Sequence, residues 1–538
     1  MKKLCLSIAL CFPLVCLAQM SEKQRFEVNK NLDVYNSILK ELNLYYVDSI
    51  EVEKTIRNDI DYMLRNLDPY TKYIPEEDMP DFIMENTGEY AGVGAIISSR
   101  ADSSMIFVVD PYEGMPAQLA GLRAGDQLLE IDGVSMEGKD SSFASDHLRG
   151  QPDTTVKIKF LRPGEKKPQI ISFERKRIEM DPVVYYGVLP DKIGYIYLSG
   201  FTTHSAESFR KALNDLRELH QIQSLIIDLR DNGGGILEEC VDILNNFIPR
   251  GELLLTMKGK IPQMDKTYRT TRNAEEPDLP LAVLTNGFSA SASEILAGAI
   301  QDLDRGVIIG SRTFGKGLVQ STRQLPFNGQ LKLTTSKYYI PSGRCIQAID
   351  YAQRDEEGRI FHIPDSLTNV FYTKSGRPVK DGGGILPDIL VEEKPIPNMV
   401  YYMDARNLFF DFVVQWRIDH PRIASPQDFV LSDETYDAFK EFVKSHHFTY
   451  DRQSERALEN LRKIMEFEKY LDSASVEFAA LENKLQPDLD RDLELYKDQL
   501  SYFLSLQIMK QYYFARGEQQ FSLRNDEMMA KAMEALSD

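Results

Sequence analysis

The chain has 538 residues, which allows about three or four domains. Hydrophobic residues make up 43% of it and charged residues 27%, values that are ordinary for a globular protein and exclude a disordered or collagen-like chain. The formal net charge is −19, and no block of clustered Lys and Arg offsets it. Such a chain repels a phosphate backbone, so we expect no nucleic acid partner.

The N-terminus is typical of a secretory signal peptide. Two lysines precede an apolar run over residues 4–17, and small residues stand before a cleavage point that we place after Ala18. A lipid anchor on Cys16 is the alternative, but Val15 is not the small residue usually found before a lipidated cysteine. No later run reaches the roughly 18 apolar residues that a spanning helix needs. The sequence therefore predicts an exported protein with no stable membrane span.

Cysteine usage leaves the redox state open. Beyond the signal peptide only Cys240 and Cys345 remain. They could pair in an oxidising compartment, but a large domain does not need that bond, so we favour two buried free thiols. No cysteine or histidine spacing resembles a zinc site.

The first part of the mature chain changes from a helical to a strand period. Residues 22–67 carry apolar side chains at steps of three and four, which predicts helices. Asp68-Pro69-Tyr70 ends that pattern, because proline disfavours helix in the residue before it. From about 88 to 175 short alternating runs such as 156–160 lie between Gly, Pro and Asp turns, which predicts a small β-rich module.

The next region alternates strands and helices. Strands are predicted at 193–198, 225–229, 281–284 and 307–309, and helices at 206–219 and 291–303. Continuous apolar strands that alternate with helices imply a sheet covered on at least one face. Beyond Pro397 the chain is helical and highly charged, and one apolar stripe there is typical of a packing face: Leu493, Tyr496, Leu500, Phe503 and Leu504.

The most informative segment is Asn286-Gly287-Phe288-Ser289-Ala290-Ser291-Ala292-Ser293-Glu294. A strand, a turn of small residues and a helix follow one another, which places Ser291 at the start of a helix. Its hydroxyl would be exposed there, and the next backbone N–H groups could hold an oxyanion. Serine is also a favoured N-cap, and Ser291 with Glu294 resembles a capping box, so a purely structural role stays open.

A lysine follows in the next element. If the segment 315–320 is a strand, Lys316 and Gln320 share one face with Leu318. Burial would lower the pKa of Lys316 and let its amine take a proton from Ser291, with Gln320 holding the amine in place. An exposed loop lysine is the structural alternative.

Two other readings of the chemistry are weaker. A Ser–His arrangement through His204 is less favoured, because Gly287-Phe288-Ser289-Ala290-Ser291 has a serine in place of the final glycine of a nucleophile elbow. The glycine clusters 233–235 and 382–384 lack the ending of a P-loop. A glycine turn after a strand can instead lend a backbone N–H to an oxyanion hole, which we assign to Gly234.

At this point the chain resembles the carboxyl-terminal processing proteases, the tail-specific serine peptidases of family S41, over roughly residues 60–395. The resemblance rests on motifs that occur in the family's order: Asp68-Pro69-Tyr70-Thr71-Lys72-Tyr73, Gly92-Val93-Gly94, Leu148-Arg149-Gly150, Asp228-Leu229-Arg230-Asp231-Asn232, Ser289-Ala290-Ser291-Ala292-Ser293-Glu294, Gly315-Lys316-Gly317, Tyr338-Tyr339-Ile340-Pro341-Ser342-Gly343-Arg344 and Leu386-Pro387-Asp388.

The resemblance implies a role for each matching position. Ser291 would be the nucleophile, Lys316 the general base and Gln320 the residue that orients it. The backbone N–H groups of Ala292 and Gly234 would form the oxyanion hole. The β-rich module looks like a PDZ domain whose loop binds the free C-terminus of a substrate, and that loop comprises Gly92, Val93, Gly94 and Ala95.

The resemblance also implies the architecture, an α/β (α+β) multidomain chain with a ClpP/crotonase-like protease core, an inserted PDZ module and helical terminal regions. We expect a signal peptide at 1–18, an N-terminal helical region at 19–87, the PDZ domain at 88–178, the protease core at 179–396 and a helical C-terminal domain at 397–538. Three features depart from the family pattern: Gly233 replaces a frequent proline, residues 348–384 resemble an insertion, and the tail after 397 lies outside the common core.

The sequence thus predicts an exported, periplasmic serine endopeptidase that acts through an acyl-enzyme and needs no metal or organic cofactor. Its partners would be proteins and peptides with free C-termini. An envelope association, a homo-oligomer and an adaptor protein stay open. Two alternatives remain: a catalytically silent PDZ scaffold, and an acyl-transfer or hydratase enzyme of crotonase type, which an export signal disfavours because coenzyme A thioesters are cytoplasmic.

Overall fold

The computed structural model describes residues 21–100, 105–354, 360–486 and 488–537, and its contacts divide the chain into two units. The smaller unit comprises the chain up to Glu76 together with Gln320–Thr334, and the larger unit comprises Glu77–Val319 and Thr335–Asp538. The predicted signal peptide lies outside the described residues. Within the described ranges, no helix has the length and apolar character needed to cross a membrane.

The smaller unit confirms the helical prediction for its first part. It contains α2 (Glu22–Tyr45), α3 (Val52–Arg65) and β1 (Lys72–Ile74), and most of β17 (Leu318–Gln324) and half of β18 (Gln330–Tyr339). Helix α3 ends before Asp68, whose carboxylate accepts the backbone N–H groups of Tyr70 (2.8 Å) and Thr71 (2.7 Å). These bonds fix the turn that the Asp-Pro-Tyr signal predicts.

The β-rich module folds as expected into a small antiparallel sheet within the larger unit. Its pattern is visible in β7, where Val156, Ile158 and Phe160 are buried and the residues between them are not. Helix α4 (Met79–Thr87) precedes the module. The module's elements are β2 (Glu89–Gly92), β3 (Ala95–Ser99), β4 (Ile106–Pro111), α5 (Pro116–Leu119), β5 (Gln127–Ile131), β6 (Val134–Ser135), α6 (Ser141–Leu148), β7 (Thr155–Leu161), β8 (Gln169–Glu174) and β9 (Lys176–Glu179).

A six-stranded sheet forms the centre of the larger unit. Its order is β10-β11-β12-β15-β16-β23, and every pair is parallel except β10 with β11. The strands are β10 (Val183–Leu189), β11 (Ile193–Leu198), β12 (Ser224–Asp228), β15 (Leu281–Thr285), β16 (Val307–Gly310) and β23 (Ile389–Leu390), and the helices between them are α7 (Ser205–His220), α8 (Leu237–Leu244) and α9 (Ala292–Asp302). The predicted strands and helices of this region are confirmed.

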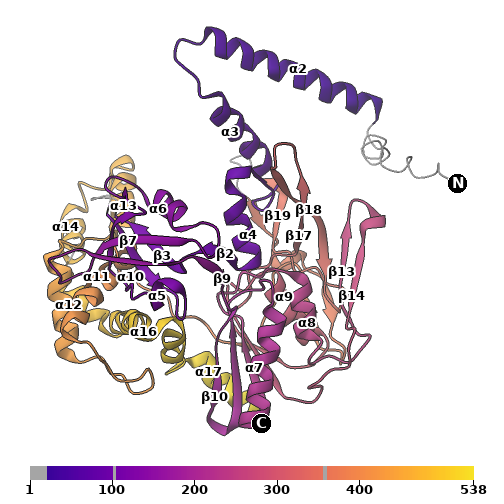
Figure 1. Cartoon of the computed structure of the whole chain (residues 1–538). Coiled ribbons are helices and arrows are strands. Elements are labelled where there is room, and N and C mark those ends of the chain that lie inside the picture. Colours follow the sequence, from indigo (N-terminus) through magenta and orange to yellow (C-terminus); the bar gives the residue numbers. More distant parts are fainter. Residues whose placement is uncertain (1–20, 101–104, 355–359, 487, 538) are drawn as a thin grey trace. The chain divides into compact units, whose positions relative to one another are not determined.

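This sheet is covered on both faces. Leu225 and Ile227 of β12 lie in a core shared with α7, α8 and α9, whereas Ile226 lies in a second core with Met528 and Met529. Those two methionines belong to α17 (Glu527–Ser537), the last helix of the chain. Neighbouring residues of a strand point to opposite faces, so the continuous apolar run of β12 requires both covers. Figure 1 shows α17, in yellow, reaching the elements of this sheet.

The remaining elements complete the larger unit. The strands are β13 (Leu253–Gly259), β14 (Lys266–Arg269), β19 (Ile349–Arg354), β20 (Ile360–His362), β21 (Val370–Tyr372) and β22 (Pro378–Lys380). The C-terminal region is helical, as predicted, with α10 (Asn398–Ala405), α11 (Leu408–Asp419), α12 (Asp433–Ser445), α13 (Gln453–Phe467), α14 (Ser475–Lys484), α15 (Leu489–Leu495) and α16 (Lys497–Ser522). The predicted packing stripe is confirmed, because Leu493, Leu500 and Leu504 are buried together.

Among the described residues, Cys240 and Cys345 are free thiols, of which Cys240 is buried and Cys345 partly buried. Cys240 is fully buried, and its Sγ atom lies 3.3 Å from the carbonyl oxygen of Ala292. Burial raises the pKa of this thiol, which makes it unreactive.

Truncating Met529 tests the cover that α17 gives to the sheet. Met529 is 3% exposed, so Met529→Ala should leave a cavity and lower the free energy of unfolding by about 2–5 kcal/mol. Lys531→Ala on the exposed side of the same helix is the matched control. Urea unfolding of both variants measures the difference, and equal midpoints would show that α17 is not part of the core.

Candidate active site

The candidate nucleophile lies at a strained position between β15 and α9. Ser291 has φ 58° and ψ −111°, a combination that residues other than glycine rarely adopt. Such strain persists only where the surroundings hold it, and it concentrates at functional sites. The next residue, Ala292, is the first of α9, where N–H groups have no partner within the helix.

The surroundings that hold Ser291 centre on one buried carboxylate. Glu294 is 0% exposed. Its Oε2 atom accepts the backbone N–H groups of Ser291 (2.8 Å) and Lys316 (2.8 Å). Its Oε1 atom accepts the Thr313 hydroxyl (2.6 Å) and the Gly315 N–H (2.7 Å). Burial raises the pKa of Glu294 to about 7, and these hydrogen bonds oppose that rise. One carboxylate thus joins the segment of the candidate nucleophile to that of the candidate base.

A tyrosine makes the complementary link on the carbonyl side. The hydroxyl of Tyr338 donates to the backbone oxygens of Lys316 (2.5 Å) and Ser291 (3.2 Å). Tyr338 is 1% exposed, so water does not compete for these bonds. Ser291 and Lys316 are therefore fixed to each other through both their N–H and their C=O groups. The sequence analysis treats Glu294 only as a capping residue and gives Tyr338 no role, because neither function shows in local spacing.

The glycine turn after β12 lies directly against the nucleophile. A Cβ atom added to Gly234 would meet Ser291 Cβ at 2.8 Å and Ala292 N at 2.9 Å, and the φ of Gly234 is 98°. Only glycine fits this conformation at this distance. The two predicted oxyanion donors, Gly234 and Ala292, are thus brought together. The Gly234 N–H donates to Asn232 Oδ1 (2.9 Å), so an oxyanion would have to share it.

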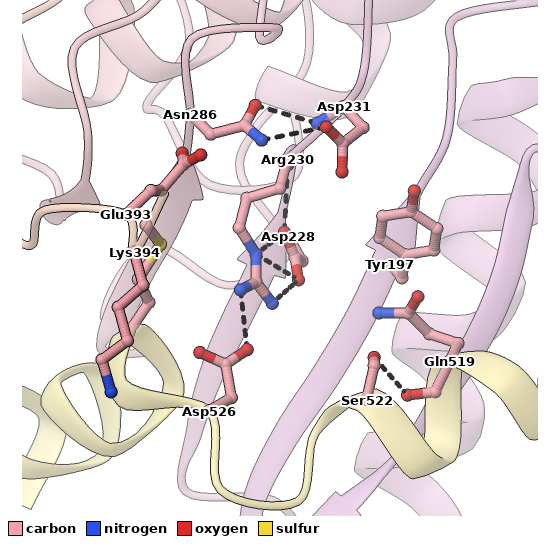
Figure 2. Close-up of a pocket in the computed structure, with 11 residues that line it drawn as sticks. Tyr197, Asp228, Arg230, Asp231, Asn286, Glu393, Lys394, Gln519, Ser522 and Asp526 are labelled. Atoms are coloured by element: carbon pink, nitrogen blue, oxygen red, sulfur yellow. Dashed lines mark hydrogen bonds and ion pairs between the residues drawn. The ribbon is translucent and has the colours of Figure 1, made fainter. Parts of the chain in front are cut away.

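The same turn supports the nucleophile segment through side chains and backbone. Asn232 O accepts the Ala290 N–H (3.0 Å), and Leu229 O accepts the Ser289 hydroxyl (2.8 Å). Asn286 Nδ2 donates to Asp231 Oδ1 (3.0 Å), and the Asp231 N–H returns a bond to Asn286 Oδ1 (3.0 Å) (Figure 2). The turn and the nucleophile segment therefore form one rigid body.

Lys316 and Gln320 are expected to share a face only if residues 315–320 form one strand, and they do not. Strand β17 begins at Leu318, so Lys316 lies in the loop before it, and the period-two argument for a shared face does not apply to it. Gln320 belongs to the smaller unit, where its side-chain amide donates to Thr334 Oγ1 (3.1 Å).

The histidine alternative finds no support in the geometry. The side chain of His204 is 60% exposed, and its ring nitrogens lie 3.4 Å from Glu207 and 3.9 Å from Glu89. Both neighbours are carboxylates, Glu207 exposed and Glu89 largely buried, and neither links His204 to Ser291. In the described part of the chain, no group of three or more His, Cys, Asp and Glu is arranged to hold a metal ion.

The predicted carboxylate-binding loop is ordered by the residues around it. Val93 O accepts the Ala117 N–H (2.9 Å), and Gly94 O accepts the Tyr112 N–H (3.0 Å). The Tyr90 ring lies over Gly92, whose added Cβ would meet it at 2.9 Å. Burial raises the pKa of Tyr90, and hydrogen bonds from the backbone of the loop residues Gly94 and Ala95 oppose the rise.

Comparison with known proteins decides the family. A model of peptidase family S41 matches residues 192–355, a PDZ domain model matches 107–162, and a model of the C-terminal helical domain of a probable PDZ-protease matches 399–536. The carboxy-terminal-processing protease of Bartonella bacilliformis is 35% identical over 323 residues, which cover 60% of this chain and 73% of that protein. The chain belongs to the carboxy-terminal processing proteases of family S41.

Other members of this protease family agree. The carboxy-terminal processing protease CtpB of Bacillus subtilis is 33% identical over 325 residues, which cover 60% of this chain and 66% of that one. Among solved structures, the photosystem II D1 C-terminal processing protease matches 67% of this chain and 87% of its own, at 25% identity and a TM-score of 0.35. The family models and the two curated relatives show a serine peptidase with a PDZ domain, as the sequence predicts.

The buried carboxylate of this protease makes stability depend on pH. Because the folded-state pKa of Glu294 is raised from 4.5 to about 7, the folded protein holds this proton more tightly than the unfolded chain. The bound proton stabilises the folded state fully below pH 4.5. This stabilisation is lost as pH rises towards about 7, which lowers the free energy of unfolding by about 3 kcal/mol. In Glu294→Gln, which does not titrate, that loss should be missing.

Urea unfolding of the wild type and Glu294→Gln at about pH 5 and about pH 8 measures this effect. The wild type should lose stability relative to the variant between the two conditions. A difference that does not change with pH would contradict the assignment.

Proposed function

We propose that this protease is an exported endopeptidase in which Ser291 attacks the scissile carbonyl and Lys316 is the general base. The observation that carries the proposal is the double link between these two residues. Glu294 accepts both of their N–H groups, and Tyr338 donates to both of their carbonyl groups. A nucleophile and its base must be held within hydrogen-bond reach, and this double link fixes the two backbone segments against each other.

The reaction follows from these roles. Ser291 Oγ bonds to the carbonyl carbon while its proton passes to Lys316 Nζ. The oxyanion then collapses, the C–N bond breaks, and Lys316 returns the proton to the leaving amine. A water molecule, deprotonated by Lys316, hydrolyses the acyl-enzyme and restores Ser291.

The oxyanion would be held by the N–H groups of Ala292 and Gly234. What supports this assignment is that the two residues lie close together: Gly234 lies against Ser291 and Ala292, and a side chain at Gly234 would not fit there. Two backbone donors aimed at one oxygen stabilise the tetrahedral intermediate most where water is excluded. Because Asn232 Oδ1 already accepts the Gly234 N–H, the oxyanion adds a second acceptor to that donor.

Substrate selection is assigned to the PDZ module. A free C-terminal carboxylate would bind the N–H groups of the loop formed by Gly92, Val93, Gly94 and Ala95, and the tail would add a strand to the sheet edge. Proteins and peptides with accessible C-termini are the substrate class. The apolar N-terminal run, with cleavage after Ala18, supports export to the periplasm.

Cleavage by residues 19–538 and by its Ser291→Ala and Lys316→Met variants tests the proposal. The substrate is a loosely folded protein that ends in a free apolar C-terminus, and mass spectrometry reads the fragments. We expect the wild type to cut and each variant to lose at least about a thousandfold in kcat. Cleavage that survives in Ser291→Ala would assign the activity to another group. A wild type that binds the tail without cutting would indicate a scaffold.

The pH profile of the same reaction tests the lysine. If neutral Lys316 is the active base, kcat should rise towards alkaline pH as the amine loses its proton. A profile that stays flat between about pH 6 and about pH 9 would argue against a titrating lysine.

A backbone change in the loop yields a second test. Gly94→Ala should abolish binding of a peptide with a free C-terminus, because the φ of Gly94 is 74° and its Cβ would meet Met115 Cβ at 2.5 Å. The same peptide with an amidated C-terminus is the control and should bind the wild type more weakly. Fluorescence anisotropy measures these affinities, and an unchanged affinity in Gly94→Ala would contradict the proposed loop.

A further inference from the structure

Asp526, the residue immediately before α17, makes an ion pair with Arg230 in the turn that supports the nucleophile. Asp526 Oδ2 lies 2.6 Å from Arg230 Nη1. Asp526 belongs to the part of the chain that matches the C-terminal helical domain, and Arg230 follows β12 in the protease core. Figure 2 shows Arg230 between Asp526 on one side and Asp228 on the other.

Arg230 is held tightly on its other side as well. Its Nη2 and Nε atoms lie 2.6 Å and 3.0 Å from the two carboxylate oxygens of Asp228. Asp228 is 0% exposed and also accepts the Tyr195 hydroxyl (2.7 Å). The guanidinium is thus charge-paired from both sides, and such a planar group fixes geometry through several bonds at once.

The backbone of Arg230 belongs to the turn on which the nucleophile segment rests. Its neighbour Leu229 accepts the Ser289 hydroxyl, and its other neighbour, Asp231, exchanges two hydrogen bonds with Asn286. Gly234, further along the same turn, lies against Ser291. A contiguous set of bonds therefore runs from Asp526 to the residues around the nucleophile.

The Asp526 carboxylate has a separate role in its own helix. Its Oδ1 atom accepts the Met529 N–H (3.1 Å), which is an N-cap bond. The docking of α17 on the sheet rests on apolar side chains, Met528, Met529 and Ala532. Apolar packing thus holds the helix on the sheet in addition to the ion pair of Asp526.

We infer that Asp526 is a positioning residue for the protease reaction, and that the C-terminal helical domain is through it a working part of the active site. The inference rests on the proposed role of Ser291. Asp526 acts through Arg230, which fixes the turn that carries Gly234 and supports the Ser289–Ser291 segment.

Without the Asp526 charge, the Arg230 guanidinium has other carboxylates within the adjoining cavity with which it can pair. A cavity of about 320 Å³ adjoins the ion pair, and Asp231 and Glu393 also line it. Without Asp526 these carboxylates compete for the guanidinium. A guanidinium drawn to Asp231 would disturb the bonds between Asp231 and Asn286. The turn would then lose its register against the nucleophile segment.

Asp526→Asn is the variant that isolates this charge, because asparagine is as good an N-cap as aspartate. We expect kcat to fall about tenfold or more while KM stays within about twofold. Glu527→Gln, one residue along and with the same change of charge, is the matched control and should keep full activity. Glu527→Gln should match the wild type in thermal unfolding, whereas Asp526→Asn should keep one cooperative transition with a lower midpoint, because it breaks a largely buried ion pair. Labelling of Ser291 by a fluorophosphonate probe should slow in Asp526→Asn in proportion to kcat.

Two outcomes would overturn the inference. One is wild-type kcat and labelling in Asp526→Asn, and the other is an equal loss in Glu527→Gln. A double-mutant cycle adds a check that folding defects do not imitate: in an Arg230→Gln background, Asp526→Asn should change kcat by less than about twofold, and a full further loss would show that Asp526 acts independently of Arg230. Failure of the proposed function looks different, since the wild type would then show no cleavage that depends on Ser291.

Discussion

The carboxylate of Glu294 is the interaction on which the candidate active site depends. A buried charge is costly unless hydrogen bonds replace the lost water, and here four donors from four residues do so. Three of these donors are backbone N–H groups, so the chain path itself is fixed. Two of them belong to Ser291 and Lys316 themselves, so the backbones of both candidate residues are fixed by the same carboxylate.

The central sheet decides where this carboxylate can act. The turns that carry Gly234 and Ser291 follow the carboxyl ends of the parallel strands β12 and β15, the edge where sites in open α/β sheets form. Both strands are buried throughout, and α17 supplies the cover for the second face. The C-terminal helical domain therefore contributes both to the core of the protease and, through Asp526, to the turn beneath the nucleophile.

Features that arise between near neighbours in the chain could be predicted from the sequence, and features that depend on distant residues could not. The helices of residues 22–65 and the alternation in β7 were predictable, because their periods arise between near neighbours. The expected strand over residues 315–320 does not include Lys316, and the reason lies in a residue distant in the sequence. Glu294 takes the N–H groups of Gly315 and Lys316, and a donor used in this way cannot join a strand ladder. Strand β17 accordingly begins only at Leu318.

The sequence by itself determined the order of the elements, the protease family and the candidate residues Ser291, Lys316 and Gly234, since motifs and periods are properties of short segments. Only the tertiary structure decided what joins them. Glu294 binds partners 19 to 22 residues further along the chain, and Tyr338 bonds to two separate segments. Asp526 pairs with Arg230, which lies far from it in the sequence. Such contacts depend on how helices and sheet pack, and residue spacing carries no record of that packing.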